Sequence, residues 1–411
     1  MTQRPCRACG AQLRHTFVDL GTSPLANSYL TAAQLNQSEQ FFPLHVFVCE
    51  NCFLVQLEEF SSPESIFEQY AYFSSFSDSW LAHARAYVSQ MIERFPIDQH
   101  SRVVEIASND GYLLQYFHAR GIPVLGIEPA ANVAEAALQK GIATRVKFFG
   151  EKTAHELAAN GEHADLLICN NVLAHVPNLN DFVRGLKVLL KPQGVITMEF
   201  PHLMRLMAEN QFDTIYHEHF SYFSCLAVER VLRRHELILF DVEELETHGG
   251  SLRVYVRHTE DFSKPIDGRV AGLKAREEAT GLNRLEHYLS FYGKVVNAKH
   301  KLLAFLIAAK ANGKAIVGYG APAKGNTLLN YCGVRSDFID YTVDRSPYKQ
   351  GHFLPGTRIP IYGPERIKDT KPDYLLILPW NLKDEIMAQM QCMREWGGRF
   401  VVPIPEVKVY A

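Results

Sequence analysis

Residues 216–222 read Tyr-His-Glu-His-Phe-Ser-Tyr, and they combine two imidazoles, one carboxylate and two phenols in seven positions. Such a set can accept a proton, pass it on, and hydrogen-bond an oxygen atom that is gaining negative charge. An isolated stretch of this kind is more often a polar surface turn. Three other features of the chain favour chemistry: paired cysteines near the N-terminus, a small-residue turn after a buried strand, and a glycine-spaced turn near the C-terminus.

The paired cysteines have the spacing of metal ligands. Cys6 and Cys9 form one Cys-x-x-Cys pair, Cys49 and Cys52 form another, and the other four of the eight cysteines stand alone. Four thiolates complete the tetrahedral shell of one zinc ion. A redox motif is the alternative interpretation, but two such pairs so close together favour metal. Because a full sulfur shell leaves no position for substrate, we expect the zinc to be structural.

The small-residue turn has the features of a cofactor site. Residues 103–107 predict a buried strand, which is followed by the turn Ser-Asn-Asp-Gly and a helix, and the next strand, at 124–127, ends in Glu128. In a Rossmann-like fold such a turn admits a ligand close to the backbone, and the acid accepts the ribose hydroxyls. Without Gly-x-Gly-x-x-Gly no pyrophosphate is cradled, which suits S-adenosylmethionine. The predicted cofactor residues are Glu105, Ser108, Asp110, Gly111, Glu128, Asn170 and Asn171.

Strands and helices alternate after this turn. Strands are predicted near 143–146 and at 166–169, 195–200, 237–242 and 252–256, and helices at 80–95, 112–119, from 151, at 182–190 and at 225–234. The last two strands should pair antiparallel and close the sheet. This order is that of a seven-stranded methyltransferase domain. His175 follows the strand at 166–169, at the carboxyl end of the sheet, where ligands bind.

The glycine-spaced turn at 319–326 opens a second α/β unit. A strand at 315–318 precedes it, a helix follows, and a later strand at 341–343 ends in an acidic and a basic residue. A turn of this kind before a helix N-terminus can hold a phosphate group. A purely structural α/β lobe is the alternative. The predicted substrate-binding residues are Tyr319, Gly320, Lys324, Gly325, Asn326, Asp344 and Arg345.

Two segments near the N-terminus connect these features. Residues 20–27 suggest a turn-rich segment, and 44–48 a strand. Residues 67–76 are unusually aromatic for a linker, and Tyr70 and Tyr72 would need hydrogen-bond partners if they were buried. Either tyrosine could reach the active site.

Composition excludes several classes of protein. With 42 basic and 45 acidic residues the net charge is -3, and no basic run suggests a nucleic-acid partner. We see neither a signal peptide nor an apolar run of membrane-spanning length. We therefore expect a cytoplasmic protein, and at 411 residues more than one domain.

Across nearly the whole chain the sequence resembles the nucleotide-sugar C-methyltransferases of deoxysugar pathways, which act on 4-keto sugars. The motifs that carry the resemblance are the cysteine pairs and residues 105–111, 171–175, 216–224 and 318–327. The Glu-His pair at 218–219 is the most specific of them. The resemblance implies an α/β fold with a zinc-binding domain at 1–75, a seven-stranded S-adenosylmethionine domain at 76–260, and a helical bridge with a Rossmann-like nucleotide-sugar domain at 261–411.

The resemblance also implies the reaction. A base removes the proton next to the sugar ketone, the enolate oxygen is steadied by a donor, and the carbon, expected to be the third of the sugar, attacks the sulfonium methyl group. His219 is the implied base, with Glu218 near it, although the sequence does not decide which of the two takes the proton. The implied oxygen-binding partners are Tyr216, His175 and one of Tyr70 and Tyr72, and Tyr222 completes the candidate catalytic set.

Two other function classes stay open on sequence alone. An O-methyltransferase acting on a sugar or another small molecule would deprotonate a hydroxyl and need no ketone. A zinc-ribbon nucleic-acid binder with a degenerate methylase core is opposed by the acidic charge balance. The expected partner is a nucleotide-linked 4-keto sugar carrying dTDP, or else GDP or another nucleotide. We expect a monomer with no nucleic-acid or membrane partner.

Overall fold

The computed structural model describes residues 4–62, 74–76 and 78–411. Tyr70 and Tyr72, two predicted site residues, lie outside this part of the chain. The chain forms two compact units. Unit 1 comprises Met1–Leu13, Cys49–His202 and Phe220–Asn283, and unit 2 comprises Arg14–Val48, Leu203–His219 and Arg284–Ala411. The three predicted domains at 1–75, 76–260 and 261–411 stay a prediction.

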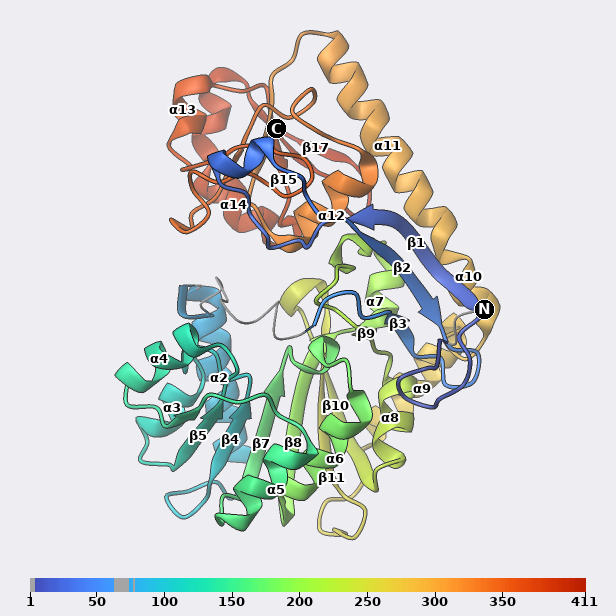
Figure 1. The fold of residues 1–411 in the computed structure, drawn as a ribbon, viewed down its shortest axis with the longest axis vertical. Helices are drawn as coiled ribbons and strands as arrows, with labels where there is room; N and C mark the ends of the chain where they lie inside the picture. The colour runs from blue at the N-terminus through green and yellow to red at the C-terminus, as the bar shows by residue number, and fades with distance from the viewer. Residues whose placement is uncertain (1–3, 63–73, 77) are drawn as a thin grey trace. The chain divides into compact units, whose positions relative to one another are not determined.

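A seven-stranded sheet forms the centre of unit 1 (Figure 1). Its order is β10 (Leu237–Leu245), β11 (Ser251–His258), β8 (Leu190–Pro201), β7 (Ala164–Asn170), β4 (Val103–Ile106), β5 (Val124–Ile127) and β6 (Thr144–Arg145). The strands from β8 to β6 run parallel, and β11 pairs antiparallel with both β8 and β10. The predicted methyltransferase sheet, with its antiparallel closing pair, is confirmed.

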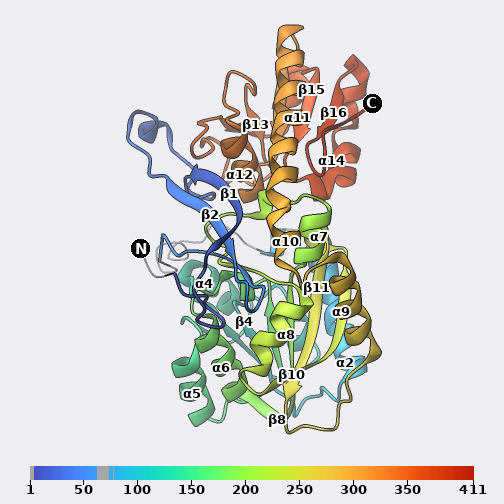
Figure 2. The same cartoon turned by 90° about the vertical axis from the view of Figure 1, so that its right-hand side faces the viewer.

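The central strands are mostly apolar because helices cover both faces of such a sheet. All four residues of β4 are buried. The helices of unit 1, several of which are seen in Figure 2, are α2 (Asp78–Arg94), α3 (Leu114–His118), α4 (Ala131–Gln139), α5 (Glu151–Ala159), α6 (Leu179–Leu189), α8 (Cys225–Arg233) and α9 (Gly268–Thr280). In α2, Ala84, Tyr87, Val88 and Met91 are buried at helical spacing, so one face of the helix enters the core.

Unit 1 also contains the cysteine quartet and a short strand pair. β3 (Val55–Leu57) pairs antiparallel with β9 (Ser221–Tyr222), so the end of the Tyr216–Tyr222 stretch forms a strand beside the segment that follows the second cysteine pair. Sequence patterns predict neither strand, because each is too short to show a period.

A six-stranded sheet forms the centre of the C-terminal part of unit 2. Its order is β14 (Ile361–Tyr362), β13 (Thr342–Val343), β12 (Ile316–Tyr319), β15 (Tyr374–Ile377), β16 (Arg399–Val402) and β17 (Lys408–Tyr410). All pairs are parallel except the last. In chain order the strands are therefore the third, second, first, fourth, fifth and sixth, which is the doubly wound arrangement of Rossmann folds. The predicted C-terminal α/β domain is confirmed.

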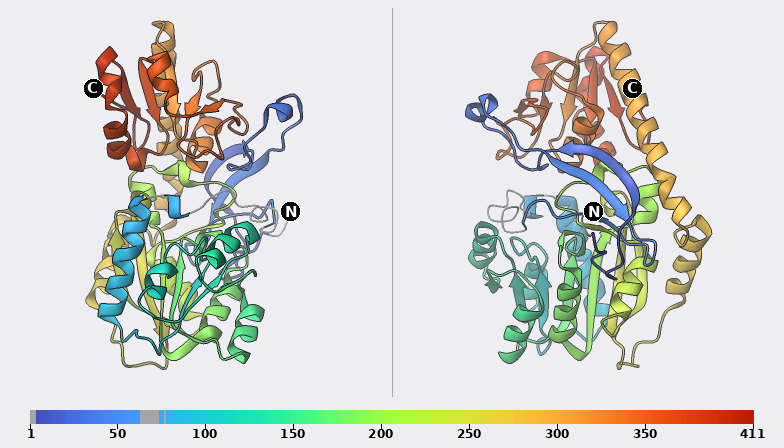
Figure 3. Two further views of the ribbon diagram at one scale, coloured as in Figure 1. Left: turned by 90° about the vertical axis from the view of Figure 1, so that its left-hand side faces the viewer. Right: turned by 45° about the vertical axis from the view of Figure 1, so that its right-hand side comes forward.

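Helices and a hairpin complete unit 2. The helices are α7 (Leu203–Ala208), α10 (Leu285–Leu289), α11 (Phe291–Ala311), α12 (Ala323–Cys332), α13 (Arg366–Thr370) and α14 (Lys383–Gln389). The hairpin of β1 (His15–Ser23) and β2 (Phe42–Val48) packs against α10 and α11, as Figure 3 shows for the long α11 in orange. Among the residues that the structure describes, no helix is long and apolar enough to cross a membrane.

The predicted turn-rich segment at 20–27 is partly wrong, because β1 runs on to Ser23. The strand register shifts between Asp19 and Thr22, and Gly21 lies there with φ +74°. The Asp19 carboxylate accepts a hydrogen bond from the Gly21 N–H at 2.9 Å. The turn-type residues therefore form a bulge within the strand and do not end it.

The N-terminus of α8 is held by one fully buried carboxylate, from Glu277 of α9. Its two oxygens accept hydrogen bonds from the Cys225 N–H at 2.7 Å and the Leu226 N–H at 2.9 Å. The same group contacts Nε2 of the buried His202 at 2.6 Å. Negative charge at a helix N-terminus satisfies N–H groups that have no partner within the helix.

We predict that Glu277→Ala lowers the free energy of unfolding by about 3–5 kcal/mol, because removing one partner leaves the others buried without compensation. Urea denaturation followed by circular dichroism measures this change. Glu278→Ala, an exposed neighbour on the same helix, is the control. Equal denaturation midpoints for the two variants would contradict the account.

Candidate active site

The Tyr216–Tyr222 stretch holds a hydrogen-bonded pair of candidate catalytic side chains. The Tyr216 hydroxyl lies 2.8 Å from His219 Nε2, and His219 Nδ1 lies 2.8 Å from the Thr214 carbonyl oxygen. A carbonyl only accepts, so Nδ1 carries a proton, and in the neutral ring the lone pair is on Nε2. Tyr216 and His219 are both half-buried. His219 is thus arranged to accept a proton at Nε2.

Glu218 lies between these two residues in the sequence, and its side chain is buried. One hydrogen bond partly compensates for the burial of its charge. The Asn27 side-chain N–H donates to Glu218 Oε1 at 2.5 Å. Burial raises the pKa of Glu218 to about 7, although the Asn27 bond opposes the shift. A carboxylate whose pKa lies near the working pH is suited to general base catalysis. Sequence reasoning missed Asn27, because it lies 191 positions from Glu218 and no local pattern connects them.

The second imidazole of the stretch has a structural role. His217 is buried, its Nε2 lies 3.2 Å from the Pro43 carbonyl oxygen, and its ring meets Phe42 edge-on. Burial lowers the pKa of His217, so the ring is neutral near pH 7. His217 therefore packs the stretch against β2. Of the two histidines in the stretch, His219 remains the candidate base.

The C-terminal turn lies at the carboxyl end of β12. The Ala321 N–H donates to the Asp344 carboxylate at 2.7 Å, and the Ala321 carbonyl accepts from Tyr29 at 2.6 Å and Lys349 at 2.9 Å. The Lys349 ammonium lies 3.6 Å from Asp344. Sequence reasoning included Asp344 but missed Tyr29 and Lys349, which bring a phenol and a cation to the same turn.

The glycines of this turn are required by packing. A Cβ at Gly318 would lie 2.7 Å from Thr342 Oγ1, one at Gly320 2.6 Å from the Pro379 ring, and one at Gly325 2.9 Å from the Leu378 side chain. Gly320 also has φ +88°, which favours glycine. Glycine spacing alone therefore does not indicate a phosphate, and the case for a ligand depends on the polar side chains.

The other predicted substrate residues have varied surroundings. Tyr319 is buried and donates to Gln389 at 3.0 Å, whereas Arg345 is exposed and lies 3.8 Å from Glu385. Asn326 is buried and donates to the Ala26 carbonyl at 2.5 Å. Lys324 donates to the Asn381 side chain at 2.8 Å. Unit 2 therefore brings Asp344 and Lys349 to the turn at Ala321, whereas the contacts of Lys324 are with Asn381 and Trp380, and Asn326 has a structural partner.

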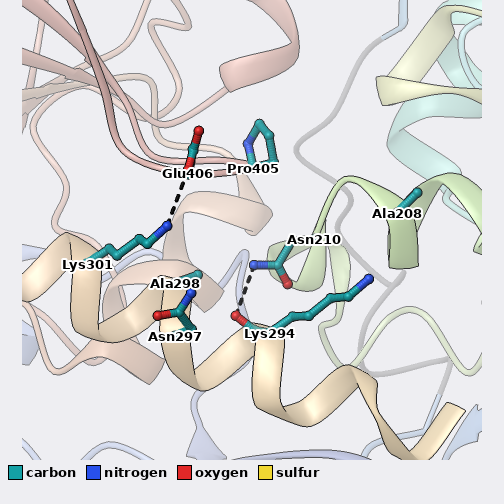
Figure 4. A pocket seen from close by; sticks show the side chains of 8 residues that line it. All are labelled: Ala208, Asn210, Lys294, Asn297, Ala298, Lys301, Pro405 and Glu406. Carbon is teal, nitrogen blue, oxygen red and sulfur yellow. Dashed lines mark hydrogen bonds and ion pairs between the residues drawn. The ribbon is translucent and has the colours of Figure 1, made fainter. Parts of the chain in front are cut away.

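A separate cavity of about 210 Å³ in unit 2 lies away from these residues (Figure 4). Its wall includes Lys301, which pairs with Glu406 at 3.3 Å, and Asn210, which donates to the Lys294 carbonyl at 3.3 Å. None of the predicted site residues lines it.

In unit 1 the predicted cofactor residues gather where β4, β5 and β7 end. Within the described chain, one oxygen of each of four buried side chains, Glu105, Ser108, Asp110 and Asn170, has no hydrogen-bond partner. Buried polar atoms are nearly always paired, so such a group of acceptors points to a ligand with donors or positive charge. S-adenosylmethionine, with its amino group, ribose hydroxyls and sulfonium, fits these acceptors.

The backbone of the turn has the shape that close approach of a ligand requires. Ala107, Asn109 and Gly111 all have positive φ, at 53°, 51° and 74°. The Asn109 side-chain oxygen accepts from the Ser74 N–H at 2.9 Å. A Cβ at Gly126 of β5 would lie 2.3 Å from Ser108 Oγ, so the glycine makes room for that serine.

Two carboxylates flank the turn. Glu128 accepts from the Asn109 N–H at 3.0 Å and the Ala130 N–H at 2.9 Å, and burial raises its pKa despite these bonds. Burial also raises the pKa of Glu105, with smaller contributions from the negative charges of Glu128 and Asp110. A cationic ligand would relieve both effects.

Trp80 forms the centre of a group of rings that includes Tyr112, the residue that follows the turn. Trp80 of α2 stacks on Tyr112 with ring centres 5.9 Å apart and on His83 at 4.9 Å, and it meets His248 edge-on at 5.0 Å. His248 lies 3.5 Å from the Asn171 side chain. These rings are not among the site residues predicted from the sequence.

His175 and Tyr222 belong to unit 1, whereas Tyr216, Glu218 and His219 belong to unit 2. His175 is half-buried at the end of a short 3-10 helix, Leu173–His175, and Tyr222 is buried in β9. The Phe220 N–H donates to the Ala174 carbonyl at 2.7 Å, which ties the segment before Tyr222 to the one that carries His175.

The four paired cysteines meet in unit 1, with their sulfur atoms within 4.8 Å of one another. Cys6 lies 3.6 Å from Cys52, and Cys9 lies 3.5 Å from Cys49. Four sulfur donors at this separation fit a tetrahedral zinc ion. The Gln56 amide donates to Cys6 at 3.1 Å, the kind of outer hydrogen bond that orients a metal ligand.

Arg7 connects the first cysteine pair to the candidate active site segment. Its guanidinium donates to the carbonyls of Phe220 and Leu57 and lies over the Phe220 ring at 5.5 Å. The Arg7 N–H donates to Gln56 at 2.9 Å. Phe220 directly follows His219, so the loop between Cys6 and Cys9 supports the end of the Tyr216–Tyr222 stretch.

Comparison with known proteins identifies the domains and the family of the chain. Three family models match in succession: "Putative zinc binding domain" over residues 6–67, "Methyltransferase domain" over 80–239, and "C-methyltransferase C-terminal domain" over 246–405. The C-methyltransferase NovU of Streptomyces niveus is 36% identical over 404 residues, which cover 98% of this chain and 96% of that protein. The chain belongs to this C-methyltransferase family.

Other relatives share only part of the chain. The ubiquinone biosynthesis O-methyltransferase of Haemophilus ducreyi is 29% identical over 101 residues, which cover 23% of this chain and 43% of that one. A solved structure, the magnesium protoporphyrin IX methyltransferase of Synechocystis PCC 6803 with bound SAM, covers 43% of this chain and 78% of that one at 14% identity, with a TM-score of 0.33. The family matches and the full-length relative, and not these partial likenesses, identify the chain as an S-adenosylmethionine-dependent C-methyltransferase. Its cysteine quartet lies in the zinc-binding domain.

We predict that the purified C-methyltransferase contains one zinc ion per chain and that Cys9→Ser lowers both the zinc content and the thermal midpoint. The reason is that a structural zinc contributes directly to folding. Metal analysis and thermal denaturation measure the two effects. Cys392→Ser, which removes a thiol outside the quartet, should change neither. Freshly purified wild-type protein without stoichiometric zinc would contradict the assignment.

We predict that Glu128→Gln weakens S-adenosylmethionine binding roughly ten- to a hundredfold, as expected for the loss of charged hydrogen bonds worth about 1.5–3 kcal/mol. Calorimetry measures the affinity, and a thermal melt shows whether the turn is intact. Glu135→Gln, on the exposed face of α4, is the matched control. An affinity equal to that of the control would refute the role of Glu128.

Proposed function

We propose that this C-methyltransferase transfers the methyl group of S-adenosylmethionine to the carbon beside the ketone, expected to be the third sugar carbon, of a nucleotide-linked 4-keto-deoxysugar. One observation carries the proposal. Unit 2 by itself combines a proton-transfer set, Tyr216, Glu218 and His219, with a doubly wound sheet whose first turn is typical of nucleotide binding.

The proton-transfer set and the sheet are held together by direct contacts. The Thr327 hydroxyl of α12 donates to the Ile215 carbonyl at 2.9 Å, and the Trp380 indole donates to Asp213 at 2.7 Å. Asn27 contacts Glu218, and two residues later in the chain Tyr29 contacts the turn at Ala321. A sugar attached to a nucleotide at this turn therefore has acid–base groups within the same unit.

The chemistry explains why a base and a donor are needed. A sugar C–H becomes acidic only beside a carbonyl, so one group must remove the proton and another must stabilise the enolate oxygen. When bound, S-adenosylmethionine supplies an electrophilic methyl group. We assign His219 Nε2 as the base and Tyr216 as a donor to the oxygen, with Tyr222, His175 and one of Tyr70 and Tyr72 as further candidate partners of that oxygen.

Glu218 has a role next to this base. With a pKa of about 7 the buried group is partly ionised at neutral pH, and it is the alternative proton acceptor. The nucleotide is assigned to the carboxyl ends of β12 and β13, where Asp344 can accept ribose hydroxyls and Lys349 can meet a phosphate. The remaining candidates at this edge are Tyr319, Gly320, Lys324, Gly325, Asn326 and Arg345.

Exchange of the sugar proton into heavy water, without a methyl donor, tests the proposal. His219→Ala should abolish exchange on a dTDP-4-keto-6-deoxyhexose and lower turnover by about 10²–10⁴-fold, the usual contribution of a positioned base. Cofactor affinity should stay unchanged. If exchange vanishes only in Glu218→Gln, then Glu218 is the base. Wild-type turnover in both variants would refute the site.

The pH dependence of turnover separates the two candidate bases, Glu218 and His219, further. Turnover should fall below about pH 7 as Glu218 takes up a proton. Asn27→Ala removes the bond that lowers this pKa, so the fall should begin at a higher pH. Ser28→Ala, an exposed neighbour of Asn27, is the control. If the wild type, Asn27→Ala and Ser28→Ala had identical pH profiles of turnover, Glu218 would be excluded from the reaction.

A further inference from the structure

The segment that precedes His219 contains a buried acid for which the proposed reaction has no use. Asp213 lies in a short 3-10 helix, Phe212–Thr214, and its side chain is fully buried. Burial raises its pKa to about 6, and the nearby Lys324 opposes this shift. A buried carboxylate is costly unless it is compensated, so its presence here requires an explanation.

The side chain that donates a hydrogen bond to Asp213 comes from the Rossmann-like part of unit 2. The Trp380 indole N–H donates to Asp213 Oδ2 at 2.7 Å, and the Lys324 ammonium lies 4.7 Å from the centre of the Trp380 ring. Lys324 in turn donates to Asn381, directly after Trp380. A cation over an indole face is an attractive arrangement. Lysine, indole and carboxylate therefore form one connected group.

The residue after Asp213 sets the proton position on the candidate base. The Thr214 carbonyl accepts the hydrogen bond from His219 Nδ1 at 2.8 Å. A peptide carbonyl moves with its neighbours, because the peptide unit is planar and only two dihedrals per residue are free. Fixing the Asp213 side chain to Trp380, together with the bond from Thr327 to Ile215, leaves this carbonyl little freedom.

We propose that Asp213 is a positioning residue: anchored by Trp380, whose ring in turn lies under the Lys324 ammonium, it holds the Thr214 carbonyl where it keeps His219 in the tautomer with the proton on Nδ1. The inference rests on the proposed function for the role of His219 in the reaction, but the tautomer itself is a property of the free protein. It also gives Lys324 a role at Asp213 in place of one at the substrate phosphate.

The test uses the full chain and reads the tautomer directly. Nitrogen-15 NMR of histidine-labelled protein distinguishes a protonated from an unprotonated ring nitrogen, and loss of a signal in His219→Gln identifies the ring among the 17 histidines. Trp380→Phe removes the indole N–H and keeps an aromatic ring. The matched control is Trp396→Phe, because the Trp396 indole is likewise a hydrogen-bond donor in unit 2, but to the Pro372 carbonyl, at 3.0 Å.

We expect Nδ1–H in wild type and in Trp396→Phe, and a mixture of tautomers in Trp380→Phe and Asp213→Ala. In the latter two, kcat should fall by roughly 10²-fold, as for a misplaced catalytic group, with the cofactor Kd unchanged. An unchanged His219 tautomer in folded Trp380→Phe would overturn the inference, as would an equal change in Trp396→Phe. A changed tautomer with normal turnover would support the positioning and refute His219 as the base. Should Asp213→Ala fail to fold, Trp380→Phe decides alone.

Discussion

The segment from Phe212 to Tyr222, which contains the candidate catalytic stretch, has almost no regular structure of its own, so its geometry depends on contacts from elsewhere in the chain. Only a three-residue 3-10 helix and a two-residue strand lie between Phe212 and Tyr222. Such a segment cannot hold a base in place by backbone pairing alone. Its geometry comes from side chains far away in the sequence, namely Trp380, Thr327, Asn27 and Arg7. Each of these removes freedom that the stretch would otherwise have.

The buried acids of the protein show how differently one chemical group can be used. Glu277 is fully compensated by two helix-end N–H groups and a histidine, so it stabilises the fold. The pKa of Glu218 is raised because one amide hydrogen bond is too little compensation for burial. Glu105 retains an oxygen that has no hydrogen-bond partner in the described chain, so this oxygen can accept a hydrogen bond from a ligand. The number of hydrogen-bond and charge partners, more than the degree of burial, separates structural from functional carboxylates in this protein.

Much of the fold was predictable because it follows from periods in the sequence. The strands of the seven-stranded sheet are apolar runs separated by amphipathic helices, and β5 begins and ends at the predicted residues, 124 and 127. In the Rossmann-like sheet the strands at 315–318 and 341–343 were predicted in the same way, whereas β14, β16 and β17 were not. The cysteine quartet was predictable because metal geometry constrains the spacing of its ligands. The bulge at Gly21 was not, since the same residues form a turn or a bulge according to the partner strand.

The candidate site was predictable in its residue types and not in its connections. The Glu-His pair and the acidic residues after the strands can be read from local sequence. The contacts of Asn27 with Glu218 and of Trp380 with Asp213 cannot, because they join positions 191 and 167 apart. The role of the glycines at 318, 320 and 325 was also hidden, because a sequence does not show which side chain occupies the space above a glycine.

Carbon-13 NMR of the product tests the central claim most directly. The protein is incubated with methyl-labelled S-adenosylmethionine and either a carbon-13-labelled dTDP-4-keto-6-deoxyhexose or the same sugar reduced to the alcohol. The account predicts a methyl signal with one-bond coupling to a ring carbon beside the ketone, and no product from the alcohol. A labelled methyl group on oxygen, or equal methylation of the reduced sugar, would contradict it.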